Sequence, residues 1–151
     1  AGDRAARALL LRYCSADAYF TIKEIDIGMV ADVGTLQRLP KLIGSQGLVR
    51  ELAYTGRKVD AEEALRIGLV NRVFATREAL HAGVREIALQ IAAKSPLSIR
   101  GTKEVLNYTR DHSVADGLQH IASWNAAMLM SKDLMAAMMA SMAKQTPEFK
   151  D

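Results

Sequence analysis

Two carboxylates eight positions apart, Glu24 and Asp32, have the clearest capacity for chemistry in this sequence. Glu24 ends a segment with β-strand character, Asp32 precedes a predicted helix, and Gly28 lies in the connection between them. A connection of this kind can turn one carboxylate toward the other. Carboxylates transfer protons efficiently when burial raises their pKa toward the working pH. The pair therefore predicts general acid–base chemistry on a substrate lying between the two side chains.

Each carboxylate also has a structural interpretation that the residues alone do not exclude. A carboxylate at the end of a strand is most often solvated. An Asp directly before a helix commonly caps its N-terminus, which is worth about 1 kcal/mol. Asp26, two positions after Glu24, is interpreted as solvated or structural.

The other reactive side chains predict no second site. His81, His112 and His120 have no metal-ligand spacing with Cys14 or with a carboxylate cluster, so no metal is expected. Cys14 is the single cysteine, so it cannot form an internal disulfide. It is predicted to be a small core residue of a protein from a reducing compartment.

Length and composition are typical of one globular domain: the chain has 151 residues, of which 50% are hydrophobic and 25% charged. The formal charge of +3 suits an anionic small ligand, such as a nucleotide phosphate, but not a nucleic acid. No apolar run reaches the roughly 18 residues that a membrane span needs. We therefore expect an intracellular protein that binds neither nucleic acid nor membrane; a bacterial cytoplasm and a mitochondrial matrix both fit.

The elements that must position the carboxylates are predicted from residue preferences and capping signals. Aromatic and β-branched residues favour strands at 18–24 and 70–74, with a third candidate at 9–13. Cap residues followed by apolar periodicity indicate helices. The expected N-caps are Asp60, Thr76, Ser95, Ser113 and Ser131, with Gly68 and Pro147 as stop signals. The sequence therefore predicts an α/β chain in which strands come first and amphipathic helices follow.

This pattern divides the chain into residues 1–75, which carry the carboxylates, and a helical region at 76–151. Apolar residues repeat at helical spacing in the second part, and we expect them to be buried. They include Val114, Leu118, Ile121, Met128 and Leu129, followed by the methionines up to Met142. Such stripes need a cover, which is either the rest of a larger domain or another subunit.

Several segments together resemble the crotonase (enoyl-CoA hydratase/isomerase) superfamily. The segments occur in the family's order at 20–28 (FTIKEIDIG), 32–40 (DVGTLQRLP), 42–44 (LIG), 51–57 (ELAYTGR), 60–73 (DAEEALRIGLVNRV), 94–97 (KSPL) with Thr102 and Lys103, and 147–149 (PEF). Three further features are most similar to the dienoyl-CoA isomerases. They are 12–14 (RYC), 31–36 (ADVGTL), and 110–114 (RDHSV) with 122–125 (ASWN).

The resemblance implies the helix-rich C-terminal part of a crotonase (ClpP/crotonase-like) fold and an isomerase of fatty-acid β-oxidation. That enzyme converts a 3,5-dienoyl-CoA to a 2,4-dienoyl-CoA, with Glu24 handling the proton at C2 and Asp32 the proton at C6. The CoA thioester is the substrate, and no cofactor is implied. Lys144 and Phe149 stand where relatives place groups near the CoA nucleotide, and the resemblance implies a homo-oligomer, a trimer or hexamer. Lys144 can also be interpreted simply as a solvated side chain. Lys94 and Lys103 could contact a phosphate, and the same simpler interpretation applies to them.

The N-terminus departs from the family pattern. Where dienoyl-CoA isomerases have an Asp and hydratases a catalytic Glu, this chain has Arg4, with Asp3 beside it. The family's two enolate-stabilising backbone amides come from segments that precede the matched region, and one lost donor costs about 2.7–4 kcal/mol. We therefore expect the 151-residue chain alone to be nearly inactive. The alternatives are a non-catalytic oligomerisation or binding module and an enoyl-CoA hydratase. The hydratase alternative needs an acidic residue at position 4, where this chain has Arg4.

Overall fold

The computed structural model describes residues 11–149, so the predictions for Asp3, Arg4 and the start of the 9–13 segment lie outside the described residues. The chain forms two compact units, one ending at Arg85 and the other beginning at Glu86. The first unit contains β1 (Tyr13–Ser15), β2 (Tyr19–Phe20), the 3₁₀ turn η1 (Glu24–Ile27), α2 (Thr35–Arg38), the 3₁₀ turn η2 (Leu39–Lys41), α3 (Gln46–Thr55), β3 (Val59–Asp60), α4 (Ala61–Arg66) and β4 (Arg72–Phe74). Helix α5 (Arg77–Ala92) contains the boundary, and α6 (Pro96–Thr109), α7 (Val114–Met128) and α8 (Lys132–Met142) follow.

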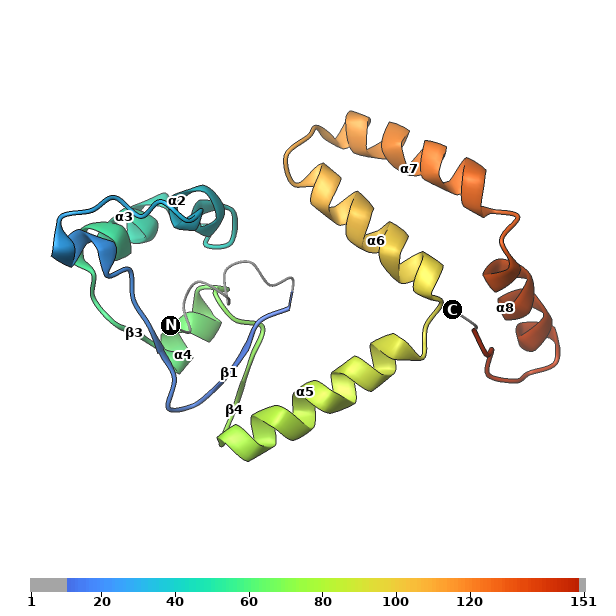
Figure 1. The fold of residues 1–151 in the computed structure, drawn as a ribbon, viewed down its shortest axis with the longest axis horizontal. Helices are drawn as coiled ribbons and strands as arrows, with labels where there is room; N and C mark the ends of the chain where they lie inside the picture. Colours follow the sequence, from blue (N-terminus) through green and yellow to red (C-terminus); the bar gives the residue numbers. More distant parts are fainter. Residues whose placement is uncertain (1–10, 150–151) are drawn as a thin grey trace. The chain divides into compact units, whose positions relative to one another are not determined.

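The strands of the first unit are short and pair in twos. Strand β1 runs parallel to β4 with Cys14 opposite Val73, and the two lie side by side in Figure 1. Strand β2 runs antiparallel to β3 with Phe20 opposite Val59. The predicted strand at 18–24 is therefore mostly wrong, because β3 offers a partner to only two of its residues. The segment predicted at 70–74 is confirmed in part, as β4.

The predicted helix starts are confirmed. The hydroxyl or carboxylate of each cap accepts a hydrogen bond from an amide three residues on, from Asp60 to Glu63, Thr76 to Ala79, Ser95 to Ser98, Ser113 to Asp116 and Ser131 to Leu134. These bonds satisfy amides that the helix itself leaves free. At α7 the bonding is reciprocal, because Asp116 also accepts from the Ser113 amide.

The core of the first unit lies between these short elements. It consists of Cys14, Ile22, Ala31, Leu39, Ile43, Val49, Leu52, Val59, Ala61, Ala64, Leu69 and Val70, with buried Phe74 near it. Cys14 is 5% exposed, as predicted for a core residue. Burial, and secondarily the negative charge of Asp17, raises the pKa of the Cys14 thiol, which keeps it protonated and unreactive.

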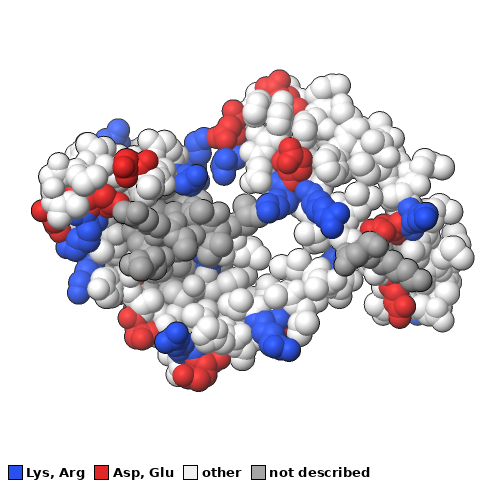
Figure 2. Space-filling view, in the orientation of Figure 1, with Lys and Arg blue, Asp and Glu red and all other residues white. Residues whose placement is uncertain are grey.

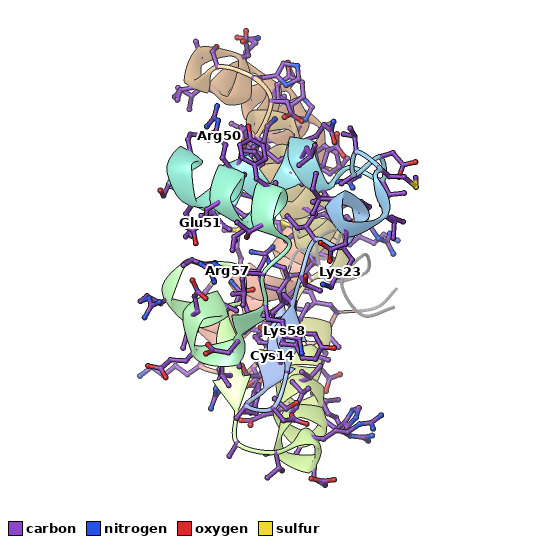
Figure 3. The ribbon with its side chains drawn as sticks, turned by 90° about the vertical axis from the view of Figure 1, so that its left-hand side faces the viewer. Cys14, Lys23, Arg50, Glu51, Arg57 and Lys58 are labelled. Atoms are coloured by element: carbon purple, nitrogen blue, oxygen red, sulfur yellow. The ribbon has the colours of Figure 1, made fainter. Side chains whose placement is uncertain are left out.

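A cluster of charged side chains joins α3 to α4 at the surface of this unit. The Arg57 guanidinium donates two hydrogen bonds of 2.8 Å to the Glu63 carboxylate and one of 2.7 Å to Glu51. Figure 3 shows Arg57 beneath α3, on the side of that helix that carries Glu51, whereas Arg50 lies on the opposite side. The hydrogen bonds from Arg57 hold the pKa of Glu63 below its usual value.

This ion pair predicts a small, acid-sensitive contribution to stability. Because the pKa of Glu63 is lowered on folding, the contribution is present above its usual value of 4.5 and is lost as the pH falls through the lower folded value. We expect at most about 1 kcal/mol, since the pair is partly exposed. In urea unfolding between pH 6 and 3, the free energy of unfolding should fall less steeply toward low pH for Glu63→Gln than for the unmodified chain. In an Arg57→Met background, Glu63→Gln should not alter how the free energy of unfolding depends on pH. If Glu63→Gln has the same effect there as in the unmodified chain, the contribution does not come from the ion pair with Arg57.

The second unit is built on a hairpin of α6 and α7, which run side by side in Figure 1. Gly101 of α6 and Gly117 of α7 are buried, and a Cβ on Gly101 would lie 2.5 Å from the indole nitrogen of Trp124. Small residues at these two points let the helices approach closely. Tyr108 stacks between His112 and His120, with ring centroids 3.8 and 4.1 Å away.

Most members of the apolar stripes on α7 and α8 are exposed within the described chain, so these stripes lack the cover that the sequence predicts from a larger domain or another subunit. Val114 is 79% exposed, Leu118 64% and Met142 81%. The physical reason is that, within residues 86–149, α6 packs against one side of α7 and no described element covers these side chains. Also within the described residues, no helix combines the length and apolar character that a membrane crossing requires.

Candidate functional site

Glu24 does not end a strand, as predicted, but begins the 3₁₀ turn η1. It is half-buried, and the chain just before it is tied to the end of α3, because the Thr21 hydroxyl donates a 2.7 Å hydrogen bond to the Gly56 carbonyl. The turn closes with the Gly28 and Met29 amides, of which Met29 donates to the Glu24 carbonyl at 3.0 Å. Glu24 is therefore held on a short, well-bonded turn.

Gly56 allows this turn to lie against α3. Its φ of +60° is the left-handed conformation that ends the helix, and an added Cβ would lie 3.2 Å from the Ile22 carbonyl and from the Ile25 side chain. A larger residue would be strained in its backbone and would push the Glu24 turn outward. The end of α3 thus sets the position of the first carboxylate.

Asp32 is exposed and lies between two buried residues, Ala31 and Thr35. The alternative interpretation of Asp32 as a helix N-cap is contradicted, because α2 begins at Thr35 and its N-cap is Gly34, which has a φ of +85°. No side chain caps this helix. The structural interpretation that competed most strongly with a chemical role for Asp32 is therefore removed.

Neither candidate carboxylate is engaged by a side-chain partner within residues 11–149. Asp26, between them in sequence, differs: its carboxylate accepts a 2.6 Å hydrogen bond from the Lys23 ammonium and is about half exposed. This contact agrees with the interpretation of Asp26 as structural. Of the three acidic residues, Glu24 and Asp32 are the two whose carboxylates remain available to a ligand.

Five apolar residues that lie near these two carboxylates in the sequence have exposed side chains. They are Ile25 (43% exposed), Ile27 (71%), Met29 (48%), Val30 (75%) and Val33 (45%). Exposed apolar side chains that gather in one region can form a contact surface for an apolar ligand or another part of a protein. The arrangement can therefore place two proton-transfer groups along an apolar molecule, such as a fatty acyl chain.

The predicted nucleotide contacts lie in the second unit and do not share a pocket. Phe149 lines a pocket of about 460 Å³ formed by α6, α7 and α8, together with Leu97, Trp124 and Leu134. Lys144 is exposed just after α8 and is not among the residues lining that pocket. Ser95 is buried at one end of the pocket, where its hydroxyl donates a short hydrogen bond to the Asp133 carboxylate. Lys94 and Lys103 are exposed.

Lys144 occupies a backbone conformation better suited to glycine. Its φ is +54°, and its own amide and the Gln145 amide donate to the Ser141 and Ala140 carbonyls at 3.1 and 2.8 Å. This pair of bonds is the Schellman motif, in which the left-handed position usually carries Gly. A lysine at this position costs stability relative to a glycine.

Lys144→Gly is therefore expected to stabilise the chain by about 1 kcal/mol. The measurement is the urea midpoint, with Lys144→Ala as the matched control, since it removes the ammonium but keeps the strained backbone. If Lys144 contacts a CoA nucleotide, both variants should lose CoA affinity equally while only the Gly variant gains stability. Equal stability of the two variants would contradict the strain argument.

Residues that position the carboxylates escaped prediction from the sequence. Thr21 and Gly56 are joined by a hydrogen bond across 35 positions of the chain. The only sequence signal for this contact is that Gly56 matches a helix-stop residue. Arg38, whose guanidinium donates to the Val33 carbonyl at 3.2 Å, carries no local signal. No group of three or more metal-ligating side chains gathers anywhere from residue 11 to residue 149.

Comparison with known proteins agrees with this architecture. The enoyl-CoA hydratase/isomerase family model matches residues 6–151. The mitochondrial Delta(3,5)-Delta(2,4)-dienoyl-CoA isomerase of Homo sapiens is 52% identical over 131 residues, which cover 87% of this chain and 40% of that protein. The peroxisomal Delta(3,5)-Delta(2,4)-dienoyl-CoA isomerase of Arabidopsis thaliana is 50% identical over 139 residues, covering 92% of this chain and 50% of that one.

Solved structures give the same answer for the fold. An enoyl-CoA hydratase from Bacillus anthracis matches with a TM-score of 0.89 at 32% identity, covering 95% of this chain and 55% of that one. The chain thus spans about half the length, or less, of the relatives it matches. The predicted fold class and the resemblance are both confirmed: the chain belongs to the enoyl-CoA hydratase/isomerase family and has the helix-rich C-terminal part of the crotonase fold.

Proposed function

We propose that this chain carries the two proton-transfer carboxylates of an acyl-CoA isomerase that converts 3,5-dienoyl-CoA to 2,4-dienoyl-CoA. Glu24 removes a proton from C2, next to the thioester, and the electron pair left behind delocalises through the diene. Asp32 returns a proton at C6. One proton leaves and one is added, so the double bonds move from C3 and C5 to C2 and C4 without any change in oxidation state. The reaction as proposed calls on no redox cofactor.

One observation carries the proposal. Glu24 and Asp32 have no side-chain partner among the described residues and lie in a segment with several exposed apolar side chains, whereas Asp26 between them is engaged by Lys23. Carboxylates are expected to be paired or solvated in polar surroundings unless they have another use. Relatives that are about half identical to this chain have names that specify the isomerisation.

The proposal extends to the ligand and to the assembly. The substrate is a CoA thioester, with Lys144 and Phe149 near its nucleotide, and the protein works as a homo-oligomer, a trimer or hexamer. The relatives' names place them in mitochondria or peroxisomes, and we propose an intracellular location for this chain. In the family, the backbone amides that stabilise the enolate precede the matched region, so the catalytic unit needs that part of the fold as well.

The test is an ultraviolet assay that follows conjugation of the diene with the thioester carbonyl. The 151-residue chain is assayed alone and after addition of the upstream segment of a dienoyl-CoA isomerase. We expect little turnover by the chain alone, because one missing oxyanion donor costs about 2.7–4 kcal/mol, and recovery when the segment is supplied. Full activity of the chain alone would contradict the need for those amides, and inactivity after stable reassembly would contradict the isomerase assignment.

A second candidate function is a non-catalytic oligomerisation module. The exposed apolar side chains of α7 and α8 favour it, since Val114 is 79% exposed and Met142 81%. A stable trimer or hexamer on sizing, with no turnover under either assay condition, would support this function over the first. The hydratase alternative predicts water addition to 2-enoyl-CoA, which the same preparations can be tested for.

A further inference from the structure

We infer that Arg38 is a positioning residue that fixes Asp32 by closing the turn on which it lies. The inference rests on the proposed function of Asp32, and it adds a residue to which neither sequence motif nor family name assigns a role. Asp32 lies just before α2, in a turn that needs hydrogen bonds from other residues to hold its conformation. No side-chain cap holds the start of α2, and the helix has only four residues, Thr35–Arg38.

Arg38 closes this turn twice. Its backbone amide donates to the Gly34 carbonyl at 3.1 Å, and its guanidinium Nη1 donates to the Val33 carbonyl at 3.2 Å. Two consecutive carbonyls are therefore bound by one residue. Val33 follows Asp32 directly and Gly34 is the next residue, so the two contacts restrict the backbone immediately after Asp32.

Gly34 makes room for this contact. The position that a Cβ would occupy on Gly34 lies only 2.9 Å from the guanidinium carbon of Arg38, and the φ of +85° is one that side-chain-bearing residues rarely adopt. The guanidinium thus lies where a Cβ on Gly34 would be, so a side chain at position 34 would have to displace it. Gly34 and Arg38 form one structural pair.

The residues on either side of the turn are fixed by burial, but the exposed residues at its centre are not. Ala31, Thr35 and Leu39 are buried, with exposed fractions of 6%, 2% and 2%. Asp32 and Val33 between them are exposed, so burial does not fix them. A proton-transfer group displaced by about 1 Å can lose about 100-fold in rate. The Arg38 contact is the interaction that prevents such a displacement.

The experiment compares Arg38→Met with a matched control, Arg50→Met. Arg50 is also an exposed arginine that donates to a backbone carbonyl, that of Gln46 at 3.1 Å, but it lies on α3. In the chain reassembled with the upstream segment, we expect Arg38→Met to lower kcat about 10- to 100-fold with KM nearly unchanged. Arg38→Lys should recover part of the loss, because an ammonium can still donate to the Val33 carbonyl. Arg50→Met should match the unmodified protein.

Two further readouts separate positioning from a general loss of structure. In an Asp32→Asn background, Arg38→Met should cause no additional loss of kcat, since the residue it positions is already disabled; an additive loss would overturn the inference. Amide hydrogen exchange on the chain alone should speed up at the amide of residue 38, which donates to the Gly34 carbonyl, in Arg38→Met and not in Arg50→Met. This second readout does not depend on turnover. If the unmodified protein proves inactive, the proposed function fails, while unchanged exchange in Arg38→Met overturns the positioning role itself.

Discussion

Asp32→Asn is expected to lower the kcat of the reassembled isomerase about 10²- to 10⁴-fold, because an amide cannot donate the proton that C6 must receive. The change should leave the free energy of unfolding within about 0.5 kcal/mol, since Asp32 is exposed and has no side-chain partner among the described residues. Loss of rate without loss of stability is the pattern of a chemical role. An Asp that only capped a helix would show little change in either quantity, because Asn caps a helix about as well as Asp.

Glu24→Gln should lower kcat by a similar factor but differs in a second measurement. In deuterated water, Asp32→Asn should still exchange the substrate's C2 hydrogen for deuterium, because Glu24 continues to remove and return that proton. Glu24→Gln should abolish both exchange and isomerisation. Mass spectrometry of recovered substrate therefore assigns each carboxylate to its carbon. Exchange lost in Asp32→Asn but kept in Glu24→Gln would reverse the two roles.

Asp26→Asn is the matched control. It removes a carboxylate from the same turn, but one that already pairs with Lys23 at 2.6 Å. We expect kcat to change less than about twofold, and stability to change by no more than an exposed ion pair contributes, about 1 kcal/mol. A loss comparable to that of Glu24→Gln would show that η1 as a whole, and not the Glu24 carboxylate, is responsible.

The helix starts could be predicted from the sequence because their chemistry is local. Ser95, Ser113 and Ser131 each bond to an amide three positions on, so the cap and its partner are visible together in the sequence. Strand limits depend on partners far along the chain. The segment at 18–24 has strand-forming residues throughout, yet pairs at only Tyr19 and Phe20 because β3 is two residues long.

The site was predictable as residue types but not as geometry. Glu24 and Asp32 stand out by charge and spacing, but a helix start at Asp32 and one at Gly34 are equally consistent with the residues alone. Gly34 as N-cap follows from the contact with Arg38 and from buried Thr35, neither of which has a local signal. The sequence also indicates that the stripes on α7 and α8 need a cover, but periodicity does not identify what supplies it.

Arg12 illustrates how a motif can carry structure. Its side chain is buried at 8% exposure, and its Nε donates a 2.6 Å hydrogen bond to the Leu69 carbonyl. Its backbone is bound on both sides by Asn71, whose amide donates to the Arg12 carbonyl at 2.7 Å and whose side-chain oxygen accepts from the Arg12 amide at 2.7 Å. These contacts join the start of β1 to the turn between α4 and β4. Burial lowers the pKa of Arg12, though the group remains charged at any ordinary pH.

Arg12→Ala is accordingly expected to destabilise the chain by about 3 kcal/mol, because it leaves the Leu69 carbonyl without its charged donor and opens a space beside the core. Urea unfolding followed by circular dichroism measures this loss. Arg12→Lys should restore little, because an ammonium cannot reproduce the planar geometry that reaches the carbonyls of Leu69 and Gly68.

The control for Arg12 lies on the partner strand. Arg72 is exposed and contacts the Phe74 ring, with the guanidinium carbon 4.6 Å from the ring centroid. Arg72→Ala removes the same side chain from a neighbouring position and should cost less than about 1 kcal/mol, the usual size of an exposed cation–π contact. If Arg12→Ala and Arg72→Ala lower the free energy of unfolding by the same amount, the buried hydrogen bonds of Arg12 contribute nothing to stability. A threefold or larger difference would show that the charged hydrogen bonds at Leu69 hold β1 against β4, the pairing on which the first unit and its carboxylates are built.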